Sequence, residues 1–83
     1  MKRDINKLLE ELQICHEKDI ITHFHLIPKE LFDFENSYIS VGFSKRINNL
    51  TKKKLRDYIQ KKYKISHIVY SSNMFFMRIY IVD

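Results

Sequence analysis

The stretch ISHIVYSSNMFFMRIYIV, residues 65–82, decides the fold. It contains two runs of β-branched and aromatic residues, 65–70 and 74–82, separated by Ser71-Ser72-Asn73, a composition typical of a tight hairpin turn. The second run is largely apolar on both faces, which alternate as Phe75, Met77, Ile79 and Ile81 on one side and Met74, Phe76, Arg78, Tyr80 and Val82 on the other. A strand of this kind lies in the middle of a sheet or at a subunit contact. We therefore expect a hairpin whose last strand lies centrally in the sheet or at a subunit contact.

A second hairpin is predicted upstream. The run 20–27, IITHFHLI, is β-branched and aromatic and stops at Pro28, which cannot donate to a central ladder. A helical turn over 28–32 and a polar connector over 33–37 lead into a strand at Tyr38–Phe43. Gly42 in that strand indicates a bulge or a close approach of another group.

Each hairpin is preceded by a predicted helix. Asp4 can cap a helix over residues 5–17, in which apolar side chains recur every three or four residues. Thr51 is the predicted cap of a second helix that runs to about Tyr63. Its expected inner face consists of Leu55, Tyr58, Ile59 and Tyr63.

These elements predict one small α+β domain over residues 1–83, in the order α-β-β-α-β-β. Two amphipathic helices packed on one face of a four-stranded antiparallel sheet would bury every apolar stripe. Neither the double-stranded-RNA-binding domain (α-β-β-β-α) nor the ribonucleoprotein RNA-binding domain (β-α-β-β-α-β) has this order. No clear sequence repeat relates the two halves.

Composition excludes several classes of protein. A single cysteine, Cys15, rules out an internal disulfide and a multi-cysteine zinc site and fits a reducing compartment. One glycine in 83 residues argues against phosphate-binding loops, and no catalytic motif is present, so we expect neither an enzyme nor a cofactor. No stretch is apolar enough to span a bilayer, which predicts a cytoplasmic protein. The frequent Lys, Ile, Asn, Tyr and Phe are typical of the AT-rich genomes of several bacteria and their phages.

Charge is strongly segregated along the chain. Residues 45–64 contain nine basic side chains and one acidic side chain, Asp57, although the whole chain has a net charge of only +5. Residues 1–44 contain five basic and eight acidic groups. Acidic residues are not interleaved among these cations, and like charges four residues apart destabilise a helix by ~0.2–0.5 kcal/mol per pair. A basic helix kept despite that cost indicates an anionic partner.

We expect a non-enzymatic nucleic-acid-binding module. The phosphate-binding residues predicted from this segment are Lys45, Arg46, Lys53, Arg56, Lys61 and Lys64. On the outer face of the sheet, Tyr38, Phe76 and Tyr80 are predicted to stack or to form a homodimer contact. A membrane partner is disfavoured, because the apolar residues of the second helix are needed in the core.

Two other functions are consistent with the sequence. The first is a small inhibitor or adaptor, such as a phage-type antagonist of a host nuclease or other nucleic-acid machine, that binds an acidic protein surface through the same basic segment. The second is a small histidine-dependent ribonuclease, since the basic chain also contains His16, His23, His25 and His67. His23 and His25 share one face of a strand, but two ligands do not make a metal site, and we expect no metal.

Overall fold

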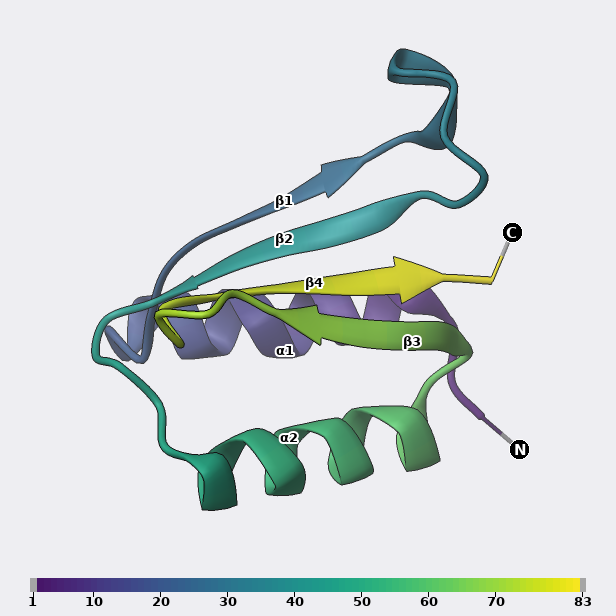
Figure 1. The fold of residues 1–83 in the computed structure, drawn as a ribbon. Helices are drawn as coiled ribbons and strands as arrows, with labels where there is room; N and C mark the ends of the chain where they lie inside the picture. The colour runs from purple at the N-terminus through teal and green to yellow at the C-terminus, as the bar shows by residue number, and fades with distance from the viewer. Residues whose placement is uncertain (1, 83) are drawn as a thin grey trace.

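The computed structural model describes residues 2–82, which form a four-stranded antiparallel sheet and two helices (Figure 1). The elements follow one another as α1 (Ile5–Glu17), β1 (Ile21–Ile27), the 3-10 turn η1 (Lys29–Leu31), β2 (Tyr38–Phe43), α2 (Asn49–Lys62), β3 (Ile65–Tyr70) and β4 (Phe76–Ile81). The strand order across the sheet is β1-β2-β4-β3. The predicted α+β class and element order are confirmed, and the last strand has one of its two expected placements, in the centre of the sheet.

The first helix begins where the sequence predicts. The Asp4 carboxylate accepts the backbone N–H groups of Asn6 at 3.1 Å and Lys7 at 3.3 Å, which satisfies two donors that a helix start leaves unpaired. Leu8 and Leu12, one turn apart, are the buried residues of this helix. The apolar stripe therefore faces the sheet.

The second helix begins earlier than predicted. Asn48 is its cap instead of Thr51, and the Asn48 side-chain oxygen accepts the Thr51 backbone N–H at 2.8 Å. Asn is at least as good a cap as Thr, and Asn48 lies where the backbone is still extended. Within the helix Ile59 is buried, as expected for the inner face. Tyr58 is also predicted to lie there, but it is 47% exposed and lies outside the core.

The turn of the last hairpin is wider than three residues. β4 begins at Phe76, so Met74 and Phe75 belong to the turn. Met74 has a φ of 65°, in the left-handed region and outside the range of regular β-strands. The Asn73 side-chain oxygen accepts the Phe75 N–H at 3.1 Å, and the Ser71 hydroxyl accepts the Phe76 N–H at 3.1 Å. Polar side chains of the turn thus accept hydrogen bonds from backbone N–H groups near the start of β4.

The core lies between the helices and one face of the sheet. The inward side chains of the two central strands are buried, namely Ile39, Val41, Phe43, Met77, Ile79 and Ile81. Leu8, Leu12, Ile59 and Tyr63 cover them from the helices or from the residue after α2. Among residues 2–82, no helix covers the opposite face of the sheet, which we call the outer face.

The two helix–hairpin halves repeat one local feature. Each edge strand has a β-bulge near its start, between Ile21 and His23 in β1 and between Ile65 and His67 in β3. The bulges share the sequence Ile-(Thr/Ser)-His, with Thr22 or Ser66 in the middle position. A three-residue match is too short to show as a repeat in the sequence alone. The structure thus shows a likeness between the two halves that is limited to this bulge.

Each bulge reverses the alternation of its strand. Ile21 and Ile65 are buried on the inner face. His23, which pairs with Gly42, and His67, which pairs with Tyr80, lie on the outer face. Gly42 is required by this arrangement, because a Cβ at that position would overlap the His23 ring. The predicted close approach at Gly42 is confirmed, whereas the bulge lies opposite it, in β1 and not in β2.

A conservative core substitution tests the predicted inner face. Ile79 is fully buried in β4, and Ile79→Val should lower the free energy of unfolding by about 0.5–1.5 kcal/mol, because it deletes one packed methylene. Ile20 is 54% exposed, and Ile20→Val should change that free energy by less than about 0.5 kcal/mol. Urea denaturation measures both, and equal effects of the two variants would contradict the placement of the core.

Candidate nucleic-acid interface

Two of the nine cations in the segment 45–64 are engaged by other groups. Lys52 lies with its Nζ 5.3 Å from the centre of the Tyr70 ring, and the Tyr70 hydroxyl donates to the Lys52 carbonyl oxygen at 2.9 Å. Burial raises the pKa of Tyr70, and the nearby positive charge of Arg56 partly offsets that effect. Lys52 thus packs along the β3 side of the helix, and its ammonium group is already in a cation–π contact.

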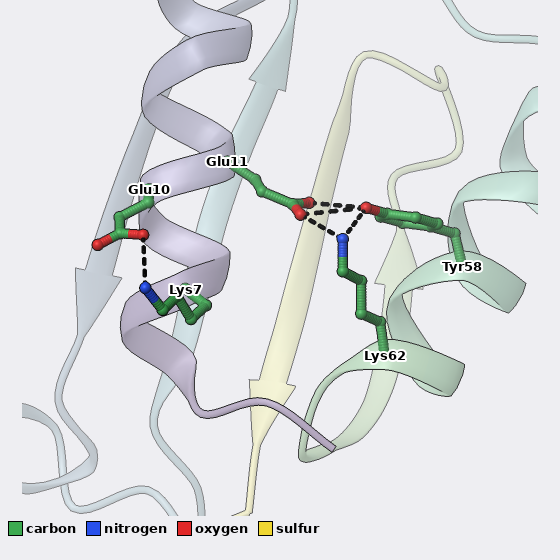
Figure 2. A network of polar contacts seen from close by, with 5 residues as sticks. All are labelled: Lys7, Glu10, Glu11, Tyr58 and Lys62. Atoms are coloured by element: carbon green, nitrogen blue, oxygen red, sulfur yellow. Dashed lines mark hydrogen bonds and ion pairs between the residues drawn. The ribbon is translucent and has the colours of Figure 1, made fainter. Parts of the chain in front are cut away.

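Lys62 is neutralised by the first helix (Figure 2). Glu11 points from α1 toward α2, where Lys62 Nζ donates to Glu11 Oε1 at 2.6 Å. The Tyr58 hydroxyl donates to the same carboxylate at 3.0 and 3.1 Å, and Lys62 also donates to the Tyr58 hydroxyl. This network explains why Tyr58 leaves the core, and it ties the two helices together.

The network also changes the acidity of its members. Burial raises the pKa of Glu11, but hydrogen bonding, most of all from Lys62, and the nearby Lys62 charge together outweigh burial, so the net pKa lies below the ordinary 4.5. The hydrogen bond to Glu11 raises the pKa of Lys62 above its ordinary 10.5. Both groups are therefore charged around neutral pH, and Lys62 contributes little net charge to the protein surface.

The remaining seven cations are exposed and define what we call the basic surface: Lys45, Arg46, Lys53, Lys54, Arg56, Lys61 and Lys64. Within residues 2–82 none of them forms an ion pair. Asp57 stands four residues before Lys61, a spacing that permits a helix ion pair, yet no such pair forms. All six predicted phosphate-binding residues belong to this surface.

The basic surface wraps around the exposed side of α2 and both of its ends. Lys45 and Arg46 precede the helix and Lys64 follows it. Lys53 and Arg56, three residues apart, share one side of the helix, and Lys54 and Lys61, two turns apart, share another. The exposed cations therefore extend along the whole length of the helix, which suits contact with an extended anionic backbone.

The predicted stacking residues lie on the outer face, away from the helices. The outward positions form three rows across the strands: His23, Gly42 and Phe76; then His25, Ser40, Arg78 and Val69; then Ile27, Tyr38, Tyr80 and His67. Phe76 is 46% exposed, as a stacking residue should be. The structure therefore separates the predicted residues into two surfaces on opposite sides of the sheet.

Tyr38 is on the outer face but is only 9% exposed, so its ring has little surface left for a ligand. The rings of Phe34 and Tyr80 pack against it, with centroids at 6.1 and 5.3 Å. The Arg78 guanidinium lies over the ring, 4.9 Å from its centre. Tyr38 thus supports its neighbours, and its predicted role as a freely available stacking residue needs this correction.

Arg78 and His67 are outer-face residues that the sequence analysis did not assign to binding. Arg78 is exposed, and its pKa is raised by a hydrogen bond with Tyr80 and by the proximity of Tyr38. His67 stacks on Tyr80 with a centroid distance of 4.5 Å and an angle of 8° between the rings. Strand alternation alone indicates the position of Arg78, but the bulge before His67 leaves no clear signal in the sequence.

Two of the histidines stack on each other, and a third lies far from them. His23 and His25 stack on each other with a centroid distance of 5.5 Å. His23 and His67 lie on opposite edge strands, so three strand spacings of ~4.8 Å place them at least about 14 Å apart. The hydroxyls of Thr22 and Ser66 lie 3.1 and 3.0 Å from the Nδ1 atoms of the histidines that follow them. Among residues 2–82, no three His, Cys, Asp or Glu side chains are grouped to hold a metal ion.

A hollow of about 530 Å³ lies between the two helices. Its apolar lining comes from both helices and from the inner face of the sheet and includes Leu12, Phe43 and Ile59. Lys45 and Arg46 of the basic surface also line it. The helices thus leave part of the inner face accessible beside exposed cations.

No protein-family model matches the chain, and no curated protein or solved structure matches it significantly. In the part of the chain that the structure describes, no helix has the length and apolarity needed to cross a bilayer.

The network between the helices predicts a pH-dependent effect. Because the pKa of Glu11 is lowered on folding, its stabilising contribution is present above about pH 4.5 and is lost as the pH falls through the folded-state pKa. Glu11→Gln should lower the thermal midpoint at pH 7, and the difference from wild type should shrink toward pH 3. Thermal melts followed by circular dichroism measure this effect.

Glu10→Gln is the matched control. Glu10 pairs with Lys7 at 3.5 Å, but both side chains are more than half exposed, so this pair contributes little. Its removal should leave the midpoint unchanged at both pH values. A Glu11→Gln midpoint equal to that of wild type at pH 7 would show that the network in Figure 2 does not stabilise the fold.

Proposed function

We propose that this protein is a non-enzymatic nucleic-acid-binding module that contacts phosphates through the basic surface. The observation that carries the proposal is the set of seven exposed cations without an ion-pair partner among residues 2–82. The protein has carboxylates elsewhere and uses one of them, Glu11, to neutralise Lys62. The seven cations of the basic surface have no such carboxylate partner among the described residues, so their charge is available to a ligand.

The position of these cations supports a phosphate partner. Lysine and arginine side chains around an exposed helix reach an extended polyanion without rearrangement of the core, and most of the energy of non-specific nucleic-acid binding comes from such contacts. Contacts with phosphates position a protein but do not read sequence. The proposed activity is therefore binding with little dependence on base sequence through this surface.

Charge reversal on the basic surface tests the proposal. If five or six of the cations contact phosphates, the logarithm of duplex affinity should fall with the logarithm of salt concentration with a slope of about −4.5 to −5.5. Lys53→Glu/Arg56→Glu should reduce the steepness of that slope by about 2 and weaken binding at every salt concentration. Fluorescence anisotropy with a labelled 20-base-pair DNA between 50 and 300 mM salt measures both quantities.

The control is the double variant Lys7→Glu/Lys18→Glu, which changes the net charge by the same amount as Lys53→Glu/Arg56→Glu. Lys7 lies in α1 and Lys18 is the C-cap residue of that helix, so both are outside the basic surface. It should bind duplex nearly as wild type does, while both double variants keep their thermal midpoint because all four residues are exposed. A flat salt response of the wild type, or equal losses in the two double variants, would refute binding through the basic surface.

The hollow between the helices favours a second candidate, the inhibitor or adaptor function. An acidic segment of a partner protein could place apolar side chains in the hollow and its carboxylates beside Lys45 and Arg46. A nucleic-acid backbone has no use for such an apolar cavity. Affinity purification from a nuclease-treated lysate separates the candidates: one stoichiometric protein that is lost with Lys45→Glu/Arg46→Glu supports the adaptor, and loss of every partner after nuclease supports nucleic acid.

A further inference from the structure

Along β4, one of the two central strands, aromatic side chains alternate with a cation on the outer face. Phe76, Arg78 and Tyr80 are successive outward residues of β4, which lies between β2 and β3. A single strand of nucleic acid likewise alternates flat bases with charged phosphates. The order of groups on β4 therefore complements a single strand, whose bases are not already paired with a partner strand.

The rings of this face differ in what they offer a ligand. Phe76 is 46% exposed and touches His23 at a centroid distance of 6.1 Å. Tyr80 is half-buried because His67 stacks on it, and His67 itself is exposed. Phe76 and His67 are thus the rings on which bases can stack, while Tyr38 and Tyr80 hold the neighbouring groups in place.

A hollow beside Arg78 provides room for a base. Its volume is about 460 Å³, and its lining includes Phe76, Arg78, Tyr80, Ser40 and Val69. This volume is within the range of about 300–1,000 Å³ that is usual for small-ligand sites. Aromatic walls on either side of a guanidinium combine stacking with attraction for phosphate.

Charge on the outer face favours an anion over a second copy of this chain. The outward positions of the four strands include Arg78 and no Asp or Glu. A two-fold contact centred on this face would bring Arg78 near its own copy with no carboxylate between them, and like charges brought together at an interface are unfavourable. A polyanion avoids this repulsion, because its phosphates can form an ion pair with the Arg78 guanidinium.

We infer that the outer face binds single-stranded nucleic acid by stacking bases on Phe76 and His67 and by pairing Arg78 with phosphate. This inference rests on the proposed function, since it names the form of nucleic acid and a second surface that recognises it. The basic surface then attracts either single or double strands by charge, and the outer face adds the preference for unpaired bases.

A tryptophan reporter tests the stacking directly. The chain has no tryptophan, so Phe76→Trp places a single indole on the outer face. Leu50→Trp, at a residue that is 62% exposed on α2, places one beside the basic surface instead. A 12-nucleotide oligothymidylate should quench the Phe76→Trp indole in a saturable manner and leave the Leu50→Trp indole nearly unchanged, because only stacked bases quench efficiently.

Affinity measurements complete the test. Phe76→Leu should weaken binding of the single strand by at least about tenfold and leave duplex affinity within about twofold, since stacking contributes to one complex only. The matched control is Phe75→Leu, the same substitution at the neighbouring turn residue outside β4, which should change neither affinity. The exposure of Phe76 makes the variant compatible with folding, and its thermal midpoint verifies this.

The possible results separate this inference from the proposed function. Quenching together with selective loss in Phe76→Leu supports it. Salt-dependent duplex binding without quenching overturns the outer-face site and leaves the basic surface intact. Absence of any nucleic-acid binding overturns both. A dimer in sedimentation that Phe76→Leu dissociates overturns the inference by showing that a second copy covers this face.

Discussion

The pairing of β2 with β4 is the constraint on which the rest of the structure depends. Ile39 lies opposite Ile79 in this pair, and both side chains are completely buried. Both helices cover the inner face of these strands, and among residues 2–82 no helix covers the outer face. The side chains on the outer face are therefore exposed, and they determine what this face can bind.

The sequence predicts most of this fold because its signals are local. Period-two alternation in residues 76–81 places Met77, Ile79 and Ile81 inward and Arg78 outward, and the structure agrees. The errors occur where polar side chains compete for backbone donors. Asn48 caps the second helix instead of Thr51. The side chains of Ser71 and Asn73 accept backbone N–H groups in a turn that is wider than predicted. Propensities rank such residues too closely to choose between neighbouring positions.

The candidate site is less predictable because it depends on packing between distant segments. Net charge identifies residues 45–64, but the sequence does not show that Glu11 neutralises Lys62 from the other helix. It places Tyr38 on the outer face without showing that Phe34, Tyr80 and Arg78 cover the ring. The bulge at Ser66 also moves His67 to the face opposite Ile65, a change that simple alternation cannot anticipate.

The paired bulges in β1 and β3 have a consequence for the protein in concentrated solution. These strands form the two edges of the sheet, where unpaired backbone groups can recruit a strand from another molecule. A bulge interrupts the regular spacing of donors and acceptors and increases the local twist, so an incoming strand cannot continue the ladder past that point. The bulges that turn His23 and His67 outward therefore also disfavour fibril growth at both edges of the sheet.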